Sequence, residues 1–180
     1  MSIRVIRGLG GTICMMTPDE RAKLEIRRLQ RDEEVQQCAQ LLTNSEPWIT
    51  LRRQYEQSVA ILKDPLKEVY IALIANSFAG FLILDMHGGF RGYIQTVAVM
   101  PEWRNRGVGS ALIKFAEDRI LRETPNVFIC VSSFNQNAQR LYARLGYEKV
   151  GELKDYAVSG HAEFLLRKTI APIAEFKPIS

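Results

Sequence analysis

The chain has 180 residues, of which 47% are hydrophobic and 24% charged, and its formal net charge is +4. The composition is that of an ordinary globular domain, and the length suffices for one domain with a substantial core but not for two of common size. The small positive charge is only weak support for nucleic-acid binding. A small anionic ligand would fit the same charge equally well.

The cysteines and the apolar runs bear on where the chain works. Cys14, Cys38 and Cys130 are odd in number and widely spaced, which argues against a disulfide framework or a zinc site and favours a reducing compartment. The first residues show no signal-peptide pattern, and no stretch approaches the roughly 20 apolar residues that a membrane span needs. We therefore predict a cytoplasmic protein without a metal site.

The first half of the chain is predicted to contain three strands after a pair of helices. Residues 1–23 show no clear period and are expected to be an extension of uncertain order. Alternating and helical apolar patterns then predict a strand, two helices and three strands, in the order 24–29, 32–43, about 50–62, 69–75, 79–85 and 93–100. The strands on either side of Asn76 and Ser77 are expected to form a hairpin.

The second half begins with a strongly amphipathic helix that is predicted to start near Gly107. A buried strand, a short helix that ends at Gly146 and two closing strands complete the pattern, over 127–131, 135–145, 147–153 and 162–167. The order β-α-α-β-β-β-α-β-α-β-β predicts a single α/β domain. Its central sheet is expected to be mixed, mostly antiparallel and flanked by helices, over residues 24–169, with a tail over 170–180.

The segment RNRGVGS, residues 104–110, links a predicted strand to a predicted helix. The first turn of a helix has free N–H groups and a partial positive charge, so it can bind a phosphate group. Gly107 and Gly109 would let the backbone approach such an anion, while Arg104 and Arg106 would add donors. The pattern alone is also that of a plain turn into a helix, and it matches neither a Walker loop nor a dinucleotide fingerprint.

A second motif on the next predicted helix, together with the first, resembles the GNAT superfamily of N-acetyltransferases. The family pattern Q/R-x-x-G-x-G/A is matched by Arg104, Gly107 and Gly109. The pattern N-x-x-A-x-x-L-Y-x-x-x-G-F/Y is matched at every position, by Asn135, Ala138, Leu141, Tyr142, Gly146 and Tyr147. The resemblance covers about residues 24–169, and the ribosomal-protein N-terminal acetyltransferases are the branch that the chain resembles most.

The resemblance implies that the chain binds acetyl-CoA and transfers its acetyl group to a primary amine. It implies that the pyrophosphate rests on the backbone amides of Arg106, Gly107, Val108, Gly109 and Ser110, and that Arg104 and Asn105 also bind the cofactor. The pantetheine arm is expected beside the backbone of Val97, Ala98 and Val99. Asn135 and Ala138 match positions that line the cofactor, although Asn135 is equally suited to cap its helix.

Tyr142 is the residue to which the resemblance assigns chemistry. When an amine attacks the thioester, the CoA thiolate must leave, and a tyrosine hydroxyl can donate a hydrogen bond or a proton to it. The alternative is a core aromatic residue at helical spacing. The proton acceptor for the amine stays unassigned, because Cys130 stands where the ribosomal branch has a glutamate and is more typical of an inert core thiol.

Other polar and aromatic residues have no assigned role. Gln95 cannot act as a base, and the remaining candidates for this role are Asp85, Glu102, Tyr156 and Glu163. The two histidines, His87 and His161, are expected on the surface. Three aromatic residues are expected to pack in the core or at its rim, namely Trp48, Tyr55 and Trp103.

Three functions stay open at this point. The first is an enzyme whose acceptor is a protein N-terminus, a lysine or a small amine. The second is a non-catalytic module that binds acyl-CoA as a sensor, suggested by the missing glutamate, and the third is an RNA-associated protein, suggested by the charge. The intact pair of Asn135 and Tyr142 favours the enzyme, since a pure binder has no need of the tyrosine. A homodimer is compatible with the sequence.

Overall fold

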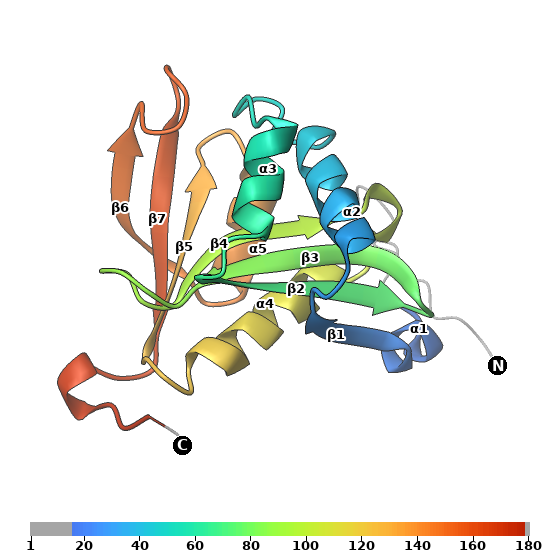
Figure 1. Ribbon diagram of the computed structural model, residues 1–180. Coiled ribbons are helices and arrows are strands. Elements are labelled where there is room, and N and C mark those ends of the chain that lie inside the picture. The colour runs from blue at the N-terminus through green and yellow to red at the C-terminus, as the bar shows by residue number, and fades with distance from the viewer. Residues whose placement is uncertain (1–15, 179–180) are drawn as a thin grey trace, which may run out of the picture.

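A seven-stranded sheet in the order β1-β2-β3-β4-β5-β7-β6 organises residues 16–178, the part of the chain that this computed structural model describes (Figure 1). Neighbouring strands are antiparallel, except β4 and β5, which are parallel. The strands are β1 (Leu24–Arg28), β2 (Lys67–Ile74), β3 (Ser77–Asp85), β4 (Tyr93–Val99), β5 (Asn126–Ser132), β6 (Glu148–Lys154) and β7 (Ala162–Thr169). The helices are α1 (Pro18–Ala22), α2 (Asp32–Thr43), α3 (Tyr55–Leu62), α4 (Val108–Ile120) and α5 (Gln136–Arg144), with 3-10 turns η1 (Pro101–Trp103) and η2 (Ile173–Glu175).

The α/β class and the mixed, mostly antiparallel sheet are confirmed, as is the hairpin of β2 and β3. The predicted start of the second helix is wrong, since α3 begins at Tyr55 rather than near residue 50. Residues 46–52 form turns, and Arg52 has a φ of 53°, which a right-handed helix cannot contain. Of the predicted extension, residues 1–15 lie outside the described residues, whereas α1 belongs to its last part and was not predicted.

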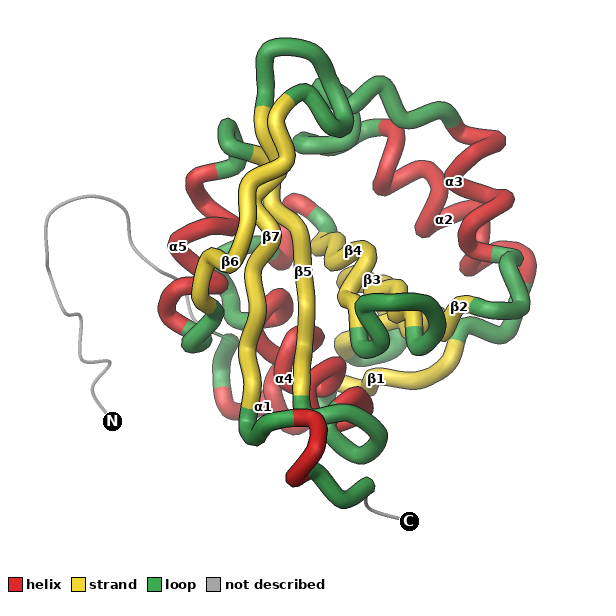
Figure 2. The backbone as a smooth tube through the Cα atoms, turned by 90° about the vertical axis from the view of Figure 1, so that its left-hand side faces the viewer, coloured by secondary structure: helices red, strands yellow, loops and turns green. Residues whose placement is uncertain are grey.

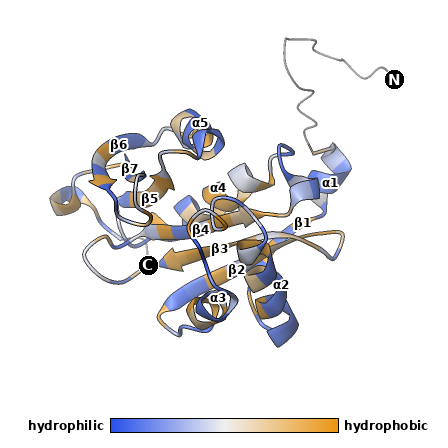
Figure 3. Ribbon diagram, turned by 90° about the horizontal axis from the view of Figure 1, so that it is seen from above, coloured by the Kyte–Doolittle hydropathy of each residue, from blue (hydrophilic) through white to orange (hydrophobic). Residues whose placement is uncertain are grey.

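Helices cover both faces of the sheet (Figure 3). On one face α4 and α5 pack in a core that includes Ile94 and Leu112. On the other face α2 and α3 pack in a core that includes Leu42 and Phe81. Both cores are closed by fully buried aliphatic and aromatic side chains, so the sheet is a rigid support for the loops at its ends.

The register between β3 and β4 shifts at Gln95. Leu84 pairs with Ile94, while the preceding residue of β3 pairs with Thr96, so Gln95 is an extra residue in β4. Because of this bulge, Ile94 lies in the core on the α4 side whereas Ala98 lies in the core on the α2 side.

The parallel strands β4 and β5 separate toward their carboxyl ends (Figure 1). Their described pairs are Tyr93 with Phe128 and Ile94 with Ile129, at the beginning of the shared stretch. From Gln95 onward the edge of β4 that faces β5 has no strand beside it. A gap therefore opens in the sheet just before the segment that leads into α4.

Glu34, in the first turn of α2, is a buried carboxylate with several donors. It accepts a hydrogen bond from the guanidinium of Arg27 at 2.7 Å and from the amides of Gln30 and Arg31 at 2.9 and 3.2 Å. The hydrogen bond from Arg27 is the main reason why the pKa of this carboxyl falls to about 2, against the opposing effect of burial. Glu34 thus ties β1 to the start of the helical layer formed by α2 and α3.

We expect the stability of the protein to depend on Glu34 at acidic pH. Since its pKa is about 2 in the folded state and near 4.5 without these contacts, it contributes stability above pH 4.5 that is lost as the pH falls toward 2. The contribution is about 3 kcal/mol. Urea denaturation at pH 7 and pH 3 should show a smaller loss of unfolding free energy for Glu34→Gln than for the wild type.

The exposed neighbour Glu33 provides the matched control for this measurement. Glu33→Gln removes the same charge from the same helical turn and should keep the wild-type loss between pH 7 and pH 3. An equal acid sensitivity of Glu34→Gln and the wild type would contradict the assignment.

Candidate active site

The arginine–glycine loop, residues 104–110, leaves backbone amides free at the start of α4. Gly107 precedes the first helical residue, and its φ of 98° is one that residues with a Cβ rarely adopt. The first helical bond runs from the amide of Ala111 to the carbonyl of Gly107 at 3.0 Å. The amides of Val108 to Ser110 therefore have no partner within the helix, and they offer an anion hydrogen bonds and a partial positive charge.

Gly109 lies between the side chains of Val99 on β4 and Leu141 on α5. A Cβ at this position would lie 3.7 Å from the side chains of Val99 and Leu141, which is ordinary contact. The backbone conformation thus requires glycine at Gly107, whereas at Gly109 the absence of a side chain leaves the first turn of α4 open.

The two arginines of the loop contact protein groups. The guanidinium of Arg104 donates to the carbonyl of Val99 at 3.0 Å and to the hydroxyl of Ser45 at 3.1 Å. The guanidinium of Arg106 lies 4.5 Å from the ring centre of Trp103 and forms an ion pair with Glu20. Sequence reasoning assigned both side chains to the anion, but the structure shows that Arg106 is engaged elsewhere, so the free donors of this loop are mainly amides.

Residues 16–23, which include α1, brace the arginine–glycine loop from outside. The amide of Met16 donates to the carbonyl of Arg106 at 2.8 Å, and Met16 is buried with its methyl group beside Gly107. Thr17 and Glu20 cap α1 reciprocally, which positions the carboxylate of Glu20 for Arg106. The sequence does contain a signal for α1, since Thr17, Pro18 and Glu20 match a capping box with proline at the first helical position. The contact between this helix and the loop has no local signal.

The edge of β4 next to the gap presents backbone donors and acceptors. The amide of Met100 donates to β3 at 3.0 Å. Because the polar groups of a strand alternate, those of Ala98 also face β3, while those of Val97 and Val99 face the gap. Two of the three residues predicted to border the pantetheine arm thus have backbone groups that point toward the open side.

Tyr142 lies on α5 and is buried in the core on the α4 side. Its ring packs against that of Tyr147, edge to face, at 5.9 Å between centres. Burial raises the pKa of its hydroxyl, which therefore stays protonated at neutral pH. Tyr142 is therefore a core aromatic residue, which is one of the two interpretations of this position. Its protonated hydroxyl is also compatible with the other interpretation, a donor to the thiolate.

Asn135 and Ala138 stand together at the start of α5. The side-chain oxygen of Asn135 accepts a hydrogen bond from the amide of Ala138 at 3.2 Å, so the capping role is confirmed. Asn135 also lines a pocket, and the two roles that its position suggested are compatible.

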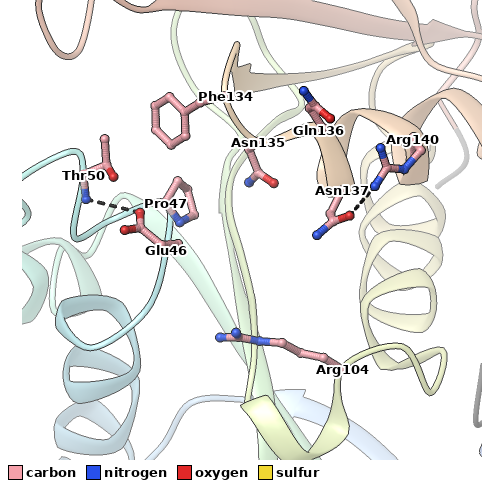
Figure 4. Close-up of a pocket in the computed structure, with 9 residues that line it drawn as sticks. All are labelled: Glu46, Pro47, Thr50, Arg104, Phe134, Asn135, Gln136, Asn137 and Arg140. Atoms are coloured by element: carbon pink, nitrogen blue, oxygen red, sulfur yellow. Dashed lines mark hydrogen bonds between the residues drawn. The ribbon is translucent and has the colours of Figure 1, made fainter. Parts of the chain in front are cut away.

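A pocket of about 520 Å³ lies where the carboxyl ends of β4 and β5 have separated (Figure 4). The turns before α3, the loop before α4 and the start of α5 enclose it. Arg104 points into it from below and Asn135 from above, as Figure 4 shows. The lining residues are Glu46, Pro47, Thr50, Arg104, Phe134, Asn135, Gln136, Asn137 and Arg140.

Most of these lining residues were not predicted individually. Glu46, Pro47 and Thr50 come from the turns that sequence reasoning assigned partly to a helix, and their position opposite Phe134 results from tertiary packing. A family motif identified Arg104 and Asn135, which are local in sequence, but no local pattern marks a contact between segments some 90 residues apart.

The candidates for a proton acceptor lie in different places. Asp85 pairs with Lys67 at the end of the β2–β3 hairpin, and Glu102 is exposed in η1. Tyr156 is 70% exposed in the loop between β6 and β7. Glu163, on β7, is buried and accepts a hydrogen bond from Ser132 on β5, close to the gap.

Cys130 lies on β5, near Tyr93 and Glu163. Burial raises the pKa of its thiol, so the side chain stays protonated at neutral pH. This agrees with the interpretation of an inert thiol rather than a base. Gln95, at the bulge of β4, has a buried side-chain oxygen without a hydrogen-bond partner among the described residues.

The remaining aromatic residues and histidines are mostly peripheral. Trp48 packs against the core under α2 and α3, as predicted, while Tyr55 is 37% exposed. His87 and His161 are both exposed, as expected, although the ring of His161 packs on Phe134 at the pocket.

Within residues 16–178 no three or more His, Cys, Asp or Glu side chains gather in a way that could hold a metal ion. In the same range no helix combines the length and apolar character needed to cross a membrane.

Comparisons with known proteins agree with this geometry. The sequence profile of the acetyltransferase (GNAT) family matches residues 25–147. A relative from Sulfurisphaera tokodaii named N-alpha-acetyltransferase is 25% identical over 119 residues, which are 58% of this chain and 71% of the relative. The fold is similar to that of Ard1 from Thermoplasma volcanium, with a TM-score of 0.71 and 17% identity over 83% of this chain and 99% of that one. It is also similar to an aminoglycoside 6'-N-acetyltransferase in complex with coenzyme A, with a TM-score of 0.67 and 16% identity over 82% of this chain and 98% of that one.

Proposed function

Since this chain belongs to the GNAT family of acetyltransferases, we propose that it moves an acetyl group from acetyl-CoA to the primary amine of an acceptor by direct attack on the thioester. One observation carries the proposal: free amides at the start of α4 stand next to a gap between two parallel strands. An anion site followed by an open strand edge suits a ligand that joins a pyrophosphate to an extended amide-containing arm.

The arginine–glycine loop would hold the pyrophosphate. The amides of Val108 to Ser110 would donate to its oxygens, together with the amide of Arg106. The contact between Met16 and the loop keeps these amides in place before the ligand arrives, which lowers the cost of ordering them.

The exposed edge of β4 would hold the pantetheine arm. The arm contains amide groups, and the amides of Val97 and Val99 and the carbonyl of Val97 offer complementary donors and an acceptor, as a neighbouring strand would. The carbonyl of Val99 already accepts from Arg104. The acetyl group would then lie deeper in the gap, between β4 and β5 and near α5. Ala138 and Asn135 would border the arm from the side of α5.

Tyr142 would assist the departure of the thiolate. The nitrogen lone pair of the amine forms a bond to the carbonyl carbon, the carbon–sulfur bond breaks, and the sulfur receives a hydrogen bond or a proton from the hydroxyl of Tyr142. This hydroxyl is protonated at the start of the step, so it can donate a hydrogen bond to the sulfur.

A protein N-terminus is the acceptor that we favour, because a relative carries the name N-alpha-acetyltransferase. A lysine side chain and a small amine are the other two classes. Action in the cytoplasm stays a prediction from the cysteines, and a homodimer stays a prediction as well.

The test combines binding with turnover. Calorimetry should detect coenzyme A binding to the purified protein, and thiol release from acetyl-CoA should occur with at least one member of a panel of peptides, lysine derivatives and polyamines. Binding without release would instead support the acyl-CoA sensor. Salt-dependent RNA binding without competition by coenzyme A would support the third function.

A further inference from the structure

Glu163 differs from the other buried glutamates of residues 16–178 in having no cationic partner. Glu34 is paired with Arg27, and Glu117 with Lys168 at 2.8 Å. Glu163 is 8% exposed, and its Oε1 accepts a hydrogen bond from the hydroxyl of Ser132. A buried carboxylate without a cation is costly, so its presence calls for a role that offsets the cost.

The second oxygen of Glu163 is available. No hydrogen bond to Oε2 is formed by the described residues, and this atom is not among their solvent-inaccessible, unpartnered polar atoms. A carboxylate oxygen has lone pairs for an N–H donor. Glu163 therefore combines one fixed oxygen with one that can receive a ligand.

Ser132 places this carboxylate at the level of the gap. Ser132 lies three residues beyond Ile129, the last residue of β5 that pairs with β4, and Val97 lies equally far beyond Ile94. Three residues of a strand span about 10 Å. Glu163, which pairs in register with Ser132, thus stands at the height of the free β4 edge, on the strand that follows β5 in the sheet.

The face of the sheet is also suitable. The side chains of Ile129 and Val131 lie in the core on the α4 side. Ser132 and, next to it in register, Glu163 project to the opposite face, because side chains alternate along a strand. Figure 2 shows α4 and α5 on one side of β5 and β7, and α2 and α3 on the other. The pocket wall that contains Phe134 begins two residues after Ser132.

We propose that Glu163 is the proton acceptor of the acetyl transfer, a catalytic residue that binds the acceptor's amino group through Oε2. The proposal rests on the proposed function. It also supplies, from β7, the carboxylate that neither Cys130 nor Gln95 provides.

An ammonium group loses one proton to Oε2 of Glu163, which frees the nitrogen lone pair, and the carboxyl later passes this proton to water. The amine then forms the carbon–nitrogen bond as the carbon–sulfur bond breaks. Tyr142 donates its hydroxyl proton to the departing thiolate. The second N–H proton, which is lost as the amide forms, replaces that proton on the oxygen of Tyr142.

The surroundings of Glu163 favour this chemistry. Burial raises the pKa of its carboxyl, although the hydrogen bond from Ser132 opposes this shift. The raised pKa makes the carboxylate a better proton acceptor. Cys130 on β5 and Tyr93 on β4 are titratable groups that interact with Glu163 electrostatically, and neither is a cation at neutral pH.

The basic residues of the neighbouring strands are more distant or face away. Arg167, on the same face of β7, is four residues farther along, about 13 Å. From β6, Leu153 is the partner of Glu163 in register, while Lys154 points to the opposite face. His161 packs on Phe134 at the pocket.

The variant Glu163→Gln tests the proposal through its pH dependence. Glutamine has the same shape and can still accept from Ser132, so the fold should persist. At pH 7, kcat/KM should fall by about 100-fold. The deficit should shrink as the pH rises toward the pKa of the amine, because the free amine then no longer needs the carboxylate. The affinity for coenzyme A should match that of the wild type.

Two further variants separate catalysis from structure. Glu152→Gln removes the same charge from the adjacent strand β6, where Glu152 is exposed, and should leave the profile unchanged. Ser132→Ala retains the carboxylate but removes its hydrogen bond, so the acidic limb of the pH profile should move to higher pH. Titration of the ¹³C-labelled carboxyl of Glu163 by NMR should give a midpoint above the ordinary value and shift in the same direction in Ser132→Ala.

The outcomes are distinct. If the wild type acetylates an amine and the kcat/KM deficit of Glu163→Gln is absent or is the same at all pH values, the role of Glu163 is overturned and the proposed function is not. A folded wild type that binds no coenzyme A or releases no thiol overturns the proposed function and this inference with it. A pH-dependent deficit with unchanged coenzyme A affinity supports both.

Discussion

Replacing Tyr142 by phenylalanine is expected to lower kcat by about ten-fold or more while coenzyme A binds as before. The hydroxyl is the only group removed, and the ring keeps its place in the core beside Tyr147. A thiolate that leaves without a proton donor is a poorer leaving group, so the loss should appear in turnover and not in binding. Steady-state kinetics and calorimetry on the same preparation provide the two numbers.

The neighbouring tyrosine gives the matched control. Tyr147 is buried against Tyr142, and its hydroxyl has no hydrogen-bond partner among the described residues. The family pattern admits phenylalanine at this position, so Tyr147→Phe should keep wild-type turnover. Equal turnover of Tyr142→Phe and the wild type would remove Tyr142 from the chemistry and leave it as a core residue.

Replacing Gly107 by alanine is expected to weaken coenzyme A binding by about ten-fold. A residue with a Cβ pays roughly 1–2 kcal/mol for the left-handed conformation that Gly107 adopts. The loop can escape this strain by moving its amides away from the anion site, and binding must then restore them. No clash adds to the strain, since the nearest atom to the new Cβ is the methyl group of Met16 at 3.6 Å.

Gly88 separates this local effect from general strain. It has a φ of 76° and nothing within 4 Å of a Cβ, in the loop between β3 and β4. Gly88→Ala should cost a similar amount of stability and leave coenzyme A affinity intact. A similar loss of affinity in both variants would show that strain acts through the whole fold, whereas no loss at Gly107 would contradict the anion site. Calorimetric titration with coenzyme A measures the dissociation constants.

The sequence predicted those parts of the molecule that are encoded locally. Apolar periodicity located α2 and α4 because each helix buries one continuous stripe, and the motif around Gly107 located the free amides because a strand, a turn and a helix follow one another there. The start of α3 was missed because its preceding turns contain residues of good helical propensity, among them Arg52.

The rest depended on contacts between distant segments. Nothing in the sequence around Glu163 indicates that Ser132 lies opposite it, since that pairing arises only when β7 inserts between β5 and β6. In the same way, the sequence predicts that the side chain of Arg106 binds the anion, whereas in the fold this side chain contacts Glu20 and Trp103. Tertiary packing, rather than propensity, decides which of several charged residues is free to react.

The bracing of the arginine–glycine loop by Met16 and Glu20 affects the choice of expression boundaries. A shortened gene product that starts at Leu24 would keep every strand of the sheet, and domain-based cloning would favour it because the family profile starts at residue 25. Such a product would lack the outer support of the arginine–glycine loop, which we propose to hold the pyrophosphate of coenzyme A. Assays on trimmed versions would then underestimate how tightly the intact polypeptide holds its acyl donor.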